Sequence, residues 1–67
     1  MIYNIGDMYR VQRDHNYSIL KLVKITDAEG NSVGIFVNTK SGPKHLPFGL
    51  NNIVEHFPKE TNPEYYL

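Results

Sequence analysis

Hydrophobic residues recur at regular intervals along residues 17–38, and a short polar stretch at residues 27–31 divides this segment in two. Both halves are rich in β-branched residues, which favour strands. Residues 27–29 suit a tight turn, and Gly30 suits the left-handed residue that closes a three-residue hairpin loop with a bulge. The segment therefore predicts a β-hairpin around which the rest of the chain folds.

The predicted loop fixes which residues of the two strands face each other. Pairing partners step outward one residue at a time on each strand, so a single loop length defines the whole register. The β-branched pairs share the odd-numbered face, which we expect to be the core face. The predicted pairs are Ile25 with Val33, Val23 with Ile35, Leu22 with Phe36 and Lys21 with Val37.

The first strand of this hairpin carries apolar residues on both faces, from Ile19 and Leu20 through Val23 to Ile25. A strand that is buried on one side for half its length and on the other side for the rest must bend, as strands do at the corners of small barrels. The alternative is one strand of a two-layer α+β domain, in which a helix covers the second face.

The segment before the hairpin predicts a further strand. Residues 8–13 alternate between polar and apolar or aromatic side chains, so Tyr9 and Val11 are expected to join the core. A polar turn at residues 14–16 makes this strand the neighbour of the hairpin. The side chains expected to look outward are Arg10, Gln12 and Arg13.

A turn and a short strand are predicted after the hairpin. Residues 39–43 form a turn, with Gly42 able to take a positive φ. Residues 44–46 form a short strand, which Pro47 ends or keeps at a sheet edge because proline cannot donate to a ladder. Short strands joined by such turns predict an antiparallel meander.

Residues 48–57 fit two interpretations. Four apolar residues have the spacing of one face of a helix, whereas residues 53–57 alternate as a short strand. The glycine and asparagines of this segment are weak helix formers. We therefore predict one helical turn at residues 49–52 followed by a strand at residues 53–57, with a single short helix as the alternative.

The opening Gly6-Asp7-x-Tyr9-x-Val11 and the hairpin from Ile25 to Val37 carry a resemblance to a known group of folds. With the helical turn and the closing strand, residues 6–57 resemble the SH3-like small barrels, which include the Tudor and KOW groups. The resemblance implies an all-β fold, a small antiparallel SH3-like barrel of about five strands with one short helical turn. Because such barrels bind peptides or nucleic acid, it also implies a binding role.

The length of 67 residues predicts one domain with a small core. We assign residues 1–58 to the barrel and residues 59–67 to a C-terminal extension. The end of this extension is too apolar for a purely solvated tail, so it docks on the barrel or presents an adhesive patch to a partner. The chain has no cysteine and therefore no disulfide, which makes a homo-oligomer a reasonable expectation.

The formal net charge is zero, which removes the simplest argument for nucleic-acid binding. Residues 1–44 carry six lysines and arginines against four acids, and residues 45–67 carry one lysine against three acids. The chain has neither an apolar run long enough to cross a membrane nor the pattern of a signal peptide. Since it begins with Met1, we expect a complete small open reading frame and a cytoplasmic protein.

The sequence predicts neither catalysis nor a bound metal. Its three histidines, His15, His45 and His56, fall on separate elements and share no ligand spacing. Its serines lie at strand starts and turns, where serine is ordinary, and its glycines form no phosphate-binding loop. We therefore expect a protein that is not an enzyme, without catalytic residues, metal or cofactor.

Protein binding is the leading hypothesis, because the chain offers exposed sheet edges, an aromatic tail and no other chemistry. Its length and composition resemble those of small phage or mobile-element regulators that bind and modulate a larger host protein. We expect a small non-enzymatic protein-binding module or regulator of this kind, with no membrane partner. The predicted contact residues are the aromatic and arginine residues that interfaces favour, with the final leucine: Tyr3, Arg10, Arg13, Phe48, Tyr65, Tyr66 and Leu67.

The alternative hypothesis is a nucleic-acid-binding small barrel. Basic residues on the first strands and a neighbouring turn alternate with Tyr9, Tyr17 and Phe36, a mixture typical of surfaces that stack single-stranded bases. The basic residues of this predicted surface are Arg10, Arg13, Lys21, Lys24, Lys40 and Lys44.

Overall fold

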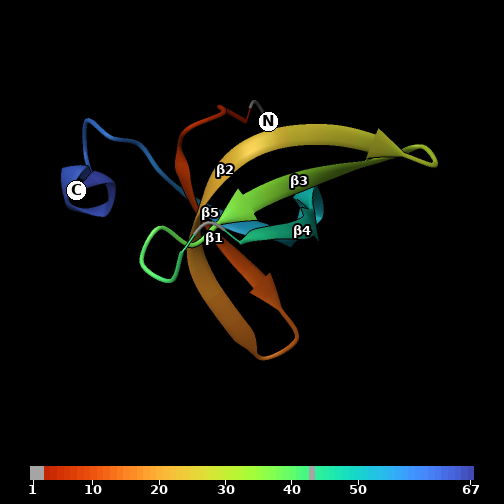
Figure 1. The fold of residues 1–67 in the computed structure, drawn as a ribbon, viewed down its shortest axis with the longest axis horizontal. Helices are drawn as coiled ribbons and strands as arrows, with labels where there is room; N and C mark the ends of the chain where they lie inside the picture. Colours follow the sequence, from red (N-terminus) through yellow and green to blue (C-terminus); the bar gives the residue numbers. More distant parts are fainter. Residues whose placement is uncertain (1–2, 43) are drawn as a thin grey trace.

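The computed structural model describes residues 3–42 and 44–67, and these form one antiparallel sheet of five strands. Two short 3-10 turns complete the secondary structure of the described residues, so the protein is all-β, as predicted (Figure 1). The elements are β1 (Met8–Arg13), β2 (Asn16–Ala28), β3 (Asn31–Val37), β4 (His45–Gly49), η1 (Leu50–Asn52), β5 (Ile53–Phe57) and η2 (Pro63–Tyr66).

Strand β2 joins two halves of the sheet. The strand order is β4-β3-β2-β1-β5, and β2 spans 13 residues. Residues 16–21 of β2 pair with β1, and residues 21–28 pair with β3. Figure 1 shows β2 curving strongly between these two partners, which confirms the predicted bend. Strands β4 and β5 form the two edges, and within the described residues no ladder joins them, so the sheet is open.

The hairpin loop differs from the prediction. Ala28 pairs with Asn31, so the loop contains only Glu29 and Gly30 rather than three residues. Both loop residues have a positive φ, 53° for Glu29 and 81° for Gly30. A two-residue turn of this kind matches the right-handed twist of the flanking strands, which explains why it replaces the predicted type I turn with a bulge.

The predicted register is right near the centre of the sheet and wrong toward the loop. Lys21 faces Val37 and Leu22 faces Phe36, as predicted. The predicted pairs Ile25 with Val33 and Val23 with Ile35 do not form. The register shifts between Leu22 and Lys24, where the extra residue is Val23. One extra residue in β2 compensates for the shorter loop, which shifts the partner of every later β2 residue. The observed partners toward the loop are Lys24 with Ile35, Ile25 with Gly34 and Thr26 with Val33.

The core lies on the side of the hairpin that carries Leu22, Gly34 and Phe36, so the prediction that the odd-numbered face is the core face is wrong. The completely buried residues Leu22 and Phe36 face each other, and Leu20 continues the same side of β2. Strand β1 adds Tyr9 and Val11, as its alternation predicts. The physical reason is volume, because this side carries the large leucine and phenylalanine side chains of the hairpin.

The remaining predicted elements are largely present. The turn and strand after residue 48 appear as η1 and β5, so neither the single short helix nor the α+β alternative is right for the residues described. Pro47 faces Ile35 from the edge strand β4, which extends beyond the predicted residues 44–46. The turn after β3 occupies residues 39–41, and Pro43 lies outside the described residues.

Tyr9 ties the segment before β1 to the core. Its hydroxyl accepts a hydrogen bond from the Asn4 backbone N–H at 2.8 Å, and its ring stacks on His56 with centroids 4.7 Å apart. Nε2 of His56 lies 2.7 Å from Oδ2 of Asp7, so β5 and the start of the chain are also joined directly. Burial raises the pKa of the Tyr9 phenol above its ordinary value of 10.0, and the carboxylate of Asp7 adds to the rise.

Gly34 provides the space for the central aromatic ring. A Cβ at Gly34 would lie 2.7 Å from Cε1 of Phe36 and 3.1 Å from Cδ1 of Leu22. Because both neighbours are fully buried, we expect Gly34→Ala to reduce the free energy of unfolding by about 1–3 kcal/mol. Urea denaturation measures this loss. The control Gly49→Ala meets the flexible Asn51 side chain instead and is expected to have a small effect; equal losses for the two variants would contradict this explanation.

The raised pKa of Tyr9 predicts a loss of stability at high pH. Below pH 10 the phenol is protonated in both the folded and the unfolded chain, so it does not make stability depend on pH. Above this value the unfolded chain releases its proton first, and the stabilising contribution is lost as pH rises through the higher folded pKa. Urea denaturation at several alkaline pH values is expected to show a smaller pH dependence for Tyr9→Phe than for the wild type. Val54→Ala, at an exposed side chain that does not titrate, is the control and is expected to keep the wild-type slope.

Candidate binding groove

Strands β1, β2 and β5 have a second apolar side, opposite the core. Met8 and Arg10 alternate with the buried residues Tyr9 and Val11, so they face away from the core. Their β2 partners on this side are Lys21 and Ile19, respectively. Phe57 of β5 lies beside Met8, and both side chains are buried although they point away from the core cluster. Another segment of the chain must therefore cover them.

The C-terminal segment provides this cover. Backbone N–H groups of Thr61 and Asn62 bond the Pro58 carbonyl at 3.3 and 2.9 Å, which turns the chain after β5. Turn η2 then places the Tyr65 ring against Phe57, with centroids 4.7 Å apart. The end of the chain therefore docks on its own sheet through the aromatic residues of η2, whereas Leu67 is fully exposed.

The Tyr66 hydroxyl fixes this docked segment. It accepts a hydrogen bond from the Met8 backbone N–H at 2.8 Å and donates one to the Phe57 carbonyl at 2.5 Å. Met8 and Phe57 are the last pair of the β1–β5 ladder. The hydroxyl therefore bridges two backbone groups at the end of the sheet and determines where the neighbouring Tyr65 ring lies.

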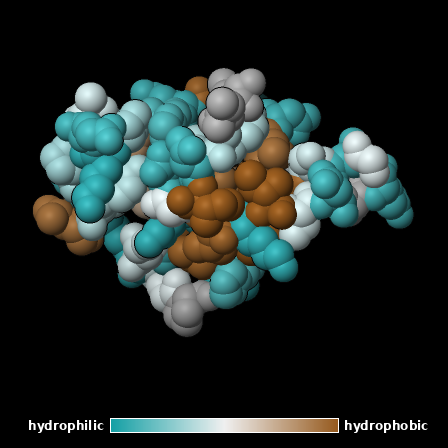
Figure 2. Space-filling model, turned by 90° about the horizontal axis from the view of Figure 1, so that it is seen from above, coloured by the Kyte–Doolittle hydropathy of each residue, from teal (hydrophilic) through white to brown (hydrophobic). Residues whose placement is uncertain are grey.

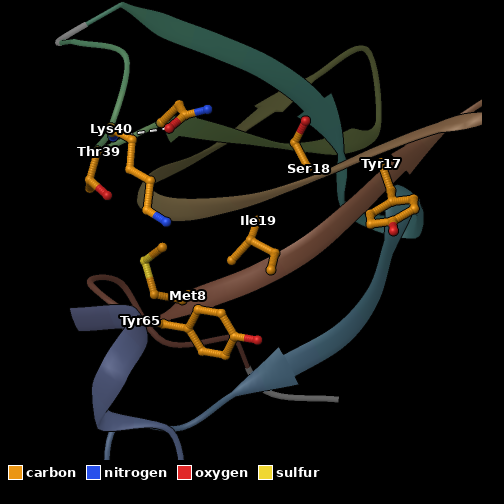
Figure 3. Close-up of a pocket in the computed structure, with 8 residues that line it drawn as sticks. Met8, Tyr17, Ser18, Ile19, Thr39, Lys40 and Tyr65 are labelled. Atoms are coloured by element: carbon orange, nitrogen blue, oxygen red, sulfur yellow. Dashed lines mark hydrogen bonds between the residues drawn. The ribbon is translucent and has the colours of Figure 1, made fainter. Parts of the chain in front are cut away.

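A groove of about 280 Å³ opens between this segment, β1, β2 and the turn after β3. Met8 and Ile19 form its apolar floor, and the rings of Tyr17 and Tyr65 stand at its sides (Figure 3). Lys40 extends from the turn so that its amino group lies over the floor (Figure 3). The other lining residues are Ser18, Asn38 and Thr39.

Arg10 supports one side of the groove. Its guanidinium carbon lies 5.2 Å from the centroid of the Tyr17 ring and 5.7 Å from that of Phe57. Its Nη1 atom forms an ion pair with Oε1 of Glu55 at 3.2 Å. A guanidinium over an aromatic face stabilises the ring orientation, so Arg10 holds the largely exposed Tyr17 beside the groove.

A smaller hollow of about 60 Å³ continues the groove. It shares Met8, Thr39 and Tyr65 with the groove and adds Lys21 to the lining. The two hollows therefore form one depression with an apolar centre and a lysine in each part. The remaining residues of the smaller hollow are Tyr66 and Leu67.

The predicted partner-binding residues lie in different parts of the molecule. Tyr65 lines the groove, Tyr66 and Leu67 line its continuation, and Arg10 lies behind Tyr17. Tyr3 and Phe48 are partly buried against the core instead. Arg13 lies with its guanidinium carbon 4.6 Å from the Phe48 ring centroid, and its Nη2 donates to the Pro47 carbonyl at 3.4 Å.

The residues predicted for nucleic-acid binding lie in different local environments. Arg10 is paired with Glu55, and Arg13 lies at Phe48. Lys21 and Lys40 flank the depression, whereas neither Lys24 nor Lys44 lines it. Among the aromatic residues predicted between them, Tyr9 and Phe36 are buried and Tyr17 is 64% exposed.

Sequence reasoning missed the floor of the groove. Ile19 shares one side of β2 with Tyr17 and Lys21, and this alternation was a usable signal. The alternation of residues 8–13 places Met8 on the same side of the strand as the outward-facing Arg10 and Gln12, although Met8 is 4% exposed. Its burial depends on the docked C-terminal segment, which local alternation does not encode.

A second apolar area lies on the outer side of the other half of the sheet. Val33, Ile35 and Val37 alternate with the buried residues Gly34 and Phe36, and they are half-buried. Figure 2 shows hydrophobic atoms gathered at the centre of the upper face of the molecule, with hydrophilic side chains around them. The groove differs in combining apolar, aromatic and charged groups, so we take it as the candidate site.

Comparison with known protein families, curated proteins and solved structures finds no match to this chain. Among residues 3–42 and 44–67, no group of three histidine or acidic side chains is arranged to hold a metal ion. None of the helical turns in that part of the chain has the length and apolar character needed to cross a bilayer. The site is therefore interpreted from its own geometry.

Removal of the Tyr66 hydroxyl tests whether it fixes the C-terminal segment. We expect Tyr66→Phe to reduce the free energy of unfolding by roughly 1–3 kcal/mol, because the Met8 N–H and the Phe57 carbonyl lose a shared partner. Hydrogen exchange of the Met8 amide is expected to accelerate. The control Tyr65→Phe keeps its ring against Phe57 and should change neither measurement much; an unchanged Met8 amide in Tyr66→Phe would refute the bridging role.

Proposed function

We propose that this protein is a non-enzymatic protein-binding module of the SH3-like type, and that its groove binds an extended segment of another protein. The strand order β4-β3-β2-β1-β5 and a 3-10 turn between β4 and β5 support the SH3-like assignment that the sequence resemblance implied. The bent strand β2, shared by two halves of the sheet, supports it as well. A small regulator that occludes a surface of a larger protein would act through such a site.

The observation that carries this proposal is the composition of the groove. Apolar residues form the floor, aromatic rings stand at the sides, and a single lysine supplies charge. Protein interfaces concentrate binding energy where an apolar or aromatic side chain enters a pocket of this kind. The volume of about 280 Å³ is at the lower limit for small-molecule sites and suits one or two side chains of a partner.

The chemistry of the lining residues also favours binding over catalysis. Ser18 and Thr39 supply hydroxyl groups, but none of the described residues lining the groove is a histidine or a carboxylate. A hydroxyl nucleophile needs an adjacent base to become reactive at neutral pH. His56, which could act as such a base, contacts Asp7 and Tyr9 instead.

Single-stranded nucleic acid is the second candidate, because of one observation. Tyr17 is 64% exposed and has the Arg10 guanidinium beside it, an arrangement on which a base could stack. The ion pair between Arg10 and Glu55 weighs against it, since phosphate affinity depends on free cationic groups. Nucleic-acid binding would weaken steeply with salt, whereas binding through apolar contacts would change little.

Selection from a random peptide library displayed on phage tests the proposal. We expect enriched peptides to share an apolar residue, and titration followed by ¹⁵N nuclear magnetic resonance to move the amide signals of residues 17–19 and 38–40. Tyr17→Ala is expected to weaken their binding about tenfold through loss of an aromatic contact. Val54→Ala, at an exposed residue of β5, is the control and should leave binding unchanged.

Two results would contradict protein binding at the groove. One is the absence of enriched peptides together with binding of fluorescein-labelled oligothymidylate that falls steeply with salt. The other is peptide binding whose signal changes lie outside the groove and which Tyr17→Ala does not weaken.

A further inference from the structure

The charged side chains that line the groove and its continuation are lysines. Lys40 lines the groove and Lys21 lines the adjoining hollow, while neither lining includes an aspartate or glutamate among the described residues. The ion pairs found in the described part of the chain join Arg10 to Glu55 and His56 to Asp7. The two lysines thus remain available to an incoming anion.

The turn after β3 holds Lys40 over the apolar floor. The Asn38 side chain accepts a hydrogen bond through Oδ1 from the Lys40 backbone N–H at 3.0 Å. The Asn38 carbonyl accepts a second one from the Ser41 N–H at 3.2 Å. These bonds fold the turn back on itself, and the Lys40 side chain extends from it over Met8 and Ile19 (Figure 3).

A partner without a negative charge would bind here at a disadvantage. When a segment fills the groove, it removes water from around the Lys40 ammonium, and an ammonium group that loses water needs a compensating charge or hydrogen bond. A carboxylate supplies this compensation, and its attraction to Lys40 increases as water leaves. Charge complementarity therefore selects the class of partner.

We propose that the groove binds an acidic segment of a protein partner, in which an apolar side chain has acidic residues two positions before and after it. This inference rests on the proposed function and specifies its ligand. In an extended chain, residues two apart point to the same side. The apolar side chain lies on Met8 and Ile19 between the rings of Tyr17 and Tyr65, and the carboxylates lie toward Lys40 and Lys21.

Three pools of fluorescein-labelled synthetic peptides test this inference. Each pool has a fixed leucine with mixed residues around it, and the positions two before and two after hold glutamate, glutamine or lysine. Fluorescence anisotropy at physiological salt measures the affinity of each pool. We expect the glutamate pool to bind about three- to tenfold more tightly than the glutamine pool, and the lysine pool to bind most weakly.

Two charge-reversal variants locate the effect. Lys40→Glu leaves Lys21 as the remaining cation opposite the new carboxylate, so it is expected to abolish the preference for the glutamate pool over the lysine pool. Lys24→Glu makes the same charge change at another exposed lysine, opposite Ile35 and outside the groove, and should keep the wild-type order. Both lysines are exposed, so both variants should fold, and thermal unfolding verifies this before the affinities are compared.

The outcomes separate this inference from the proposed function. Equal binding of the glutamate and glutamine pools, or an unchanged order in Lys40→Glu, would overturn the acidic preference while leaving peptide binding in place. If no pool binds and oligothymidylate does, both proposals fail.

Discussion

The sheet depends on one irregularity in β2, the extra residue at Val23. A regular strand of 13 residues would keep the same side buried along its whole length. Its pairings with β1 and β3 would then lie in one sheet without a sharp bend. The register shift lets β2 turn, so that its first half pairs with β1 and its second half pairs with β3. The turn brings Leu20 and Leu22 together with Tyr9 and Phe36 in one small core. A chain of 67 residues can bury only a few large side chains, and these four are among those it buries.

The same bend leaves a second apolar side on β1, β2 and β5, and the C-terminal segment covers only part of it. The aromatic residues of η2 bury Met8 and Phe57 at one end, where the Tyr66 hydroxyl joins the two strands. The rest of this side remains open beside Ile19 and becomes the groove. One docked segment thus contributes to stability and also forms a wall of the candidate site. Any change that releases this segment should therefore alter both properties together.

The proposed preference of the groove for an acidic segment depends on the charges around it. The cations on the side of the sheet opposite the core have two different environments. Arg10 forms an ion pair with Glu55 and supports an aromatic ring. Lys21 and Lys40 lie beside an apolar surface, and the described lining contains no aspartate or glutamate side chain. A nucleic-acid surface would need the cations to follow a backbone of phosphates. Two lysines around an apolar centre instead suit a short segment that combines a hydrophobic side chain with carboxylates.

The all-β class, the turn and closing strand after residue 48, and the burial of Tyr9 and Val11 were predictable from sequence, because alternation and turn residues act locally. The sequence did not determine the length of the hairpin loop or the bulge at Val23, since these two features compensate for each other in the register. Which side of the hairpin forms the core depends on tertiary packing, because packing volume overrides the pairing of β-branched residues. The candidate site also depends on tertiary structure. The aromatic tail drew attention to Tyr65 from the sequence, but Met8, Ile19 and Lys40 come together only when residues distant in sequence meet around a docked segment.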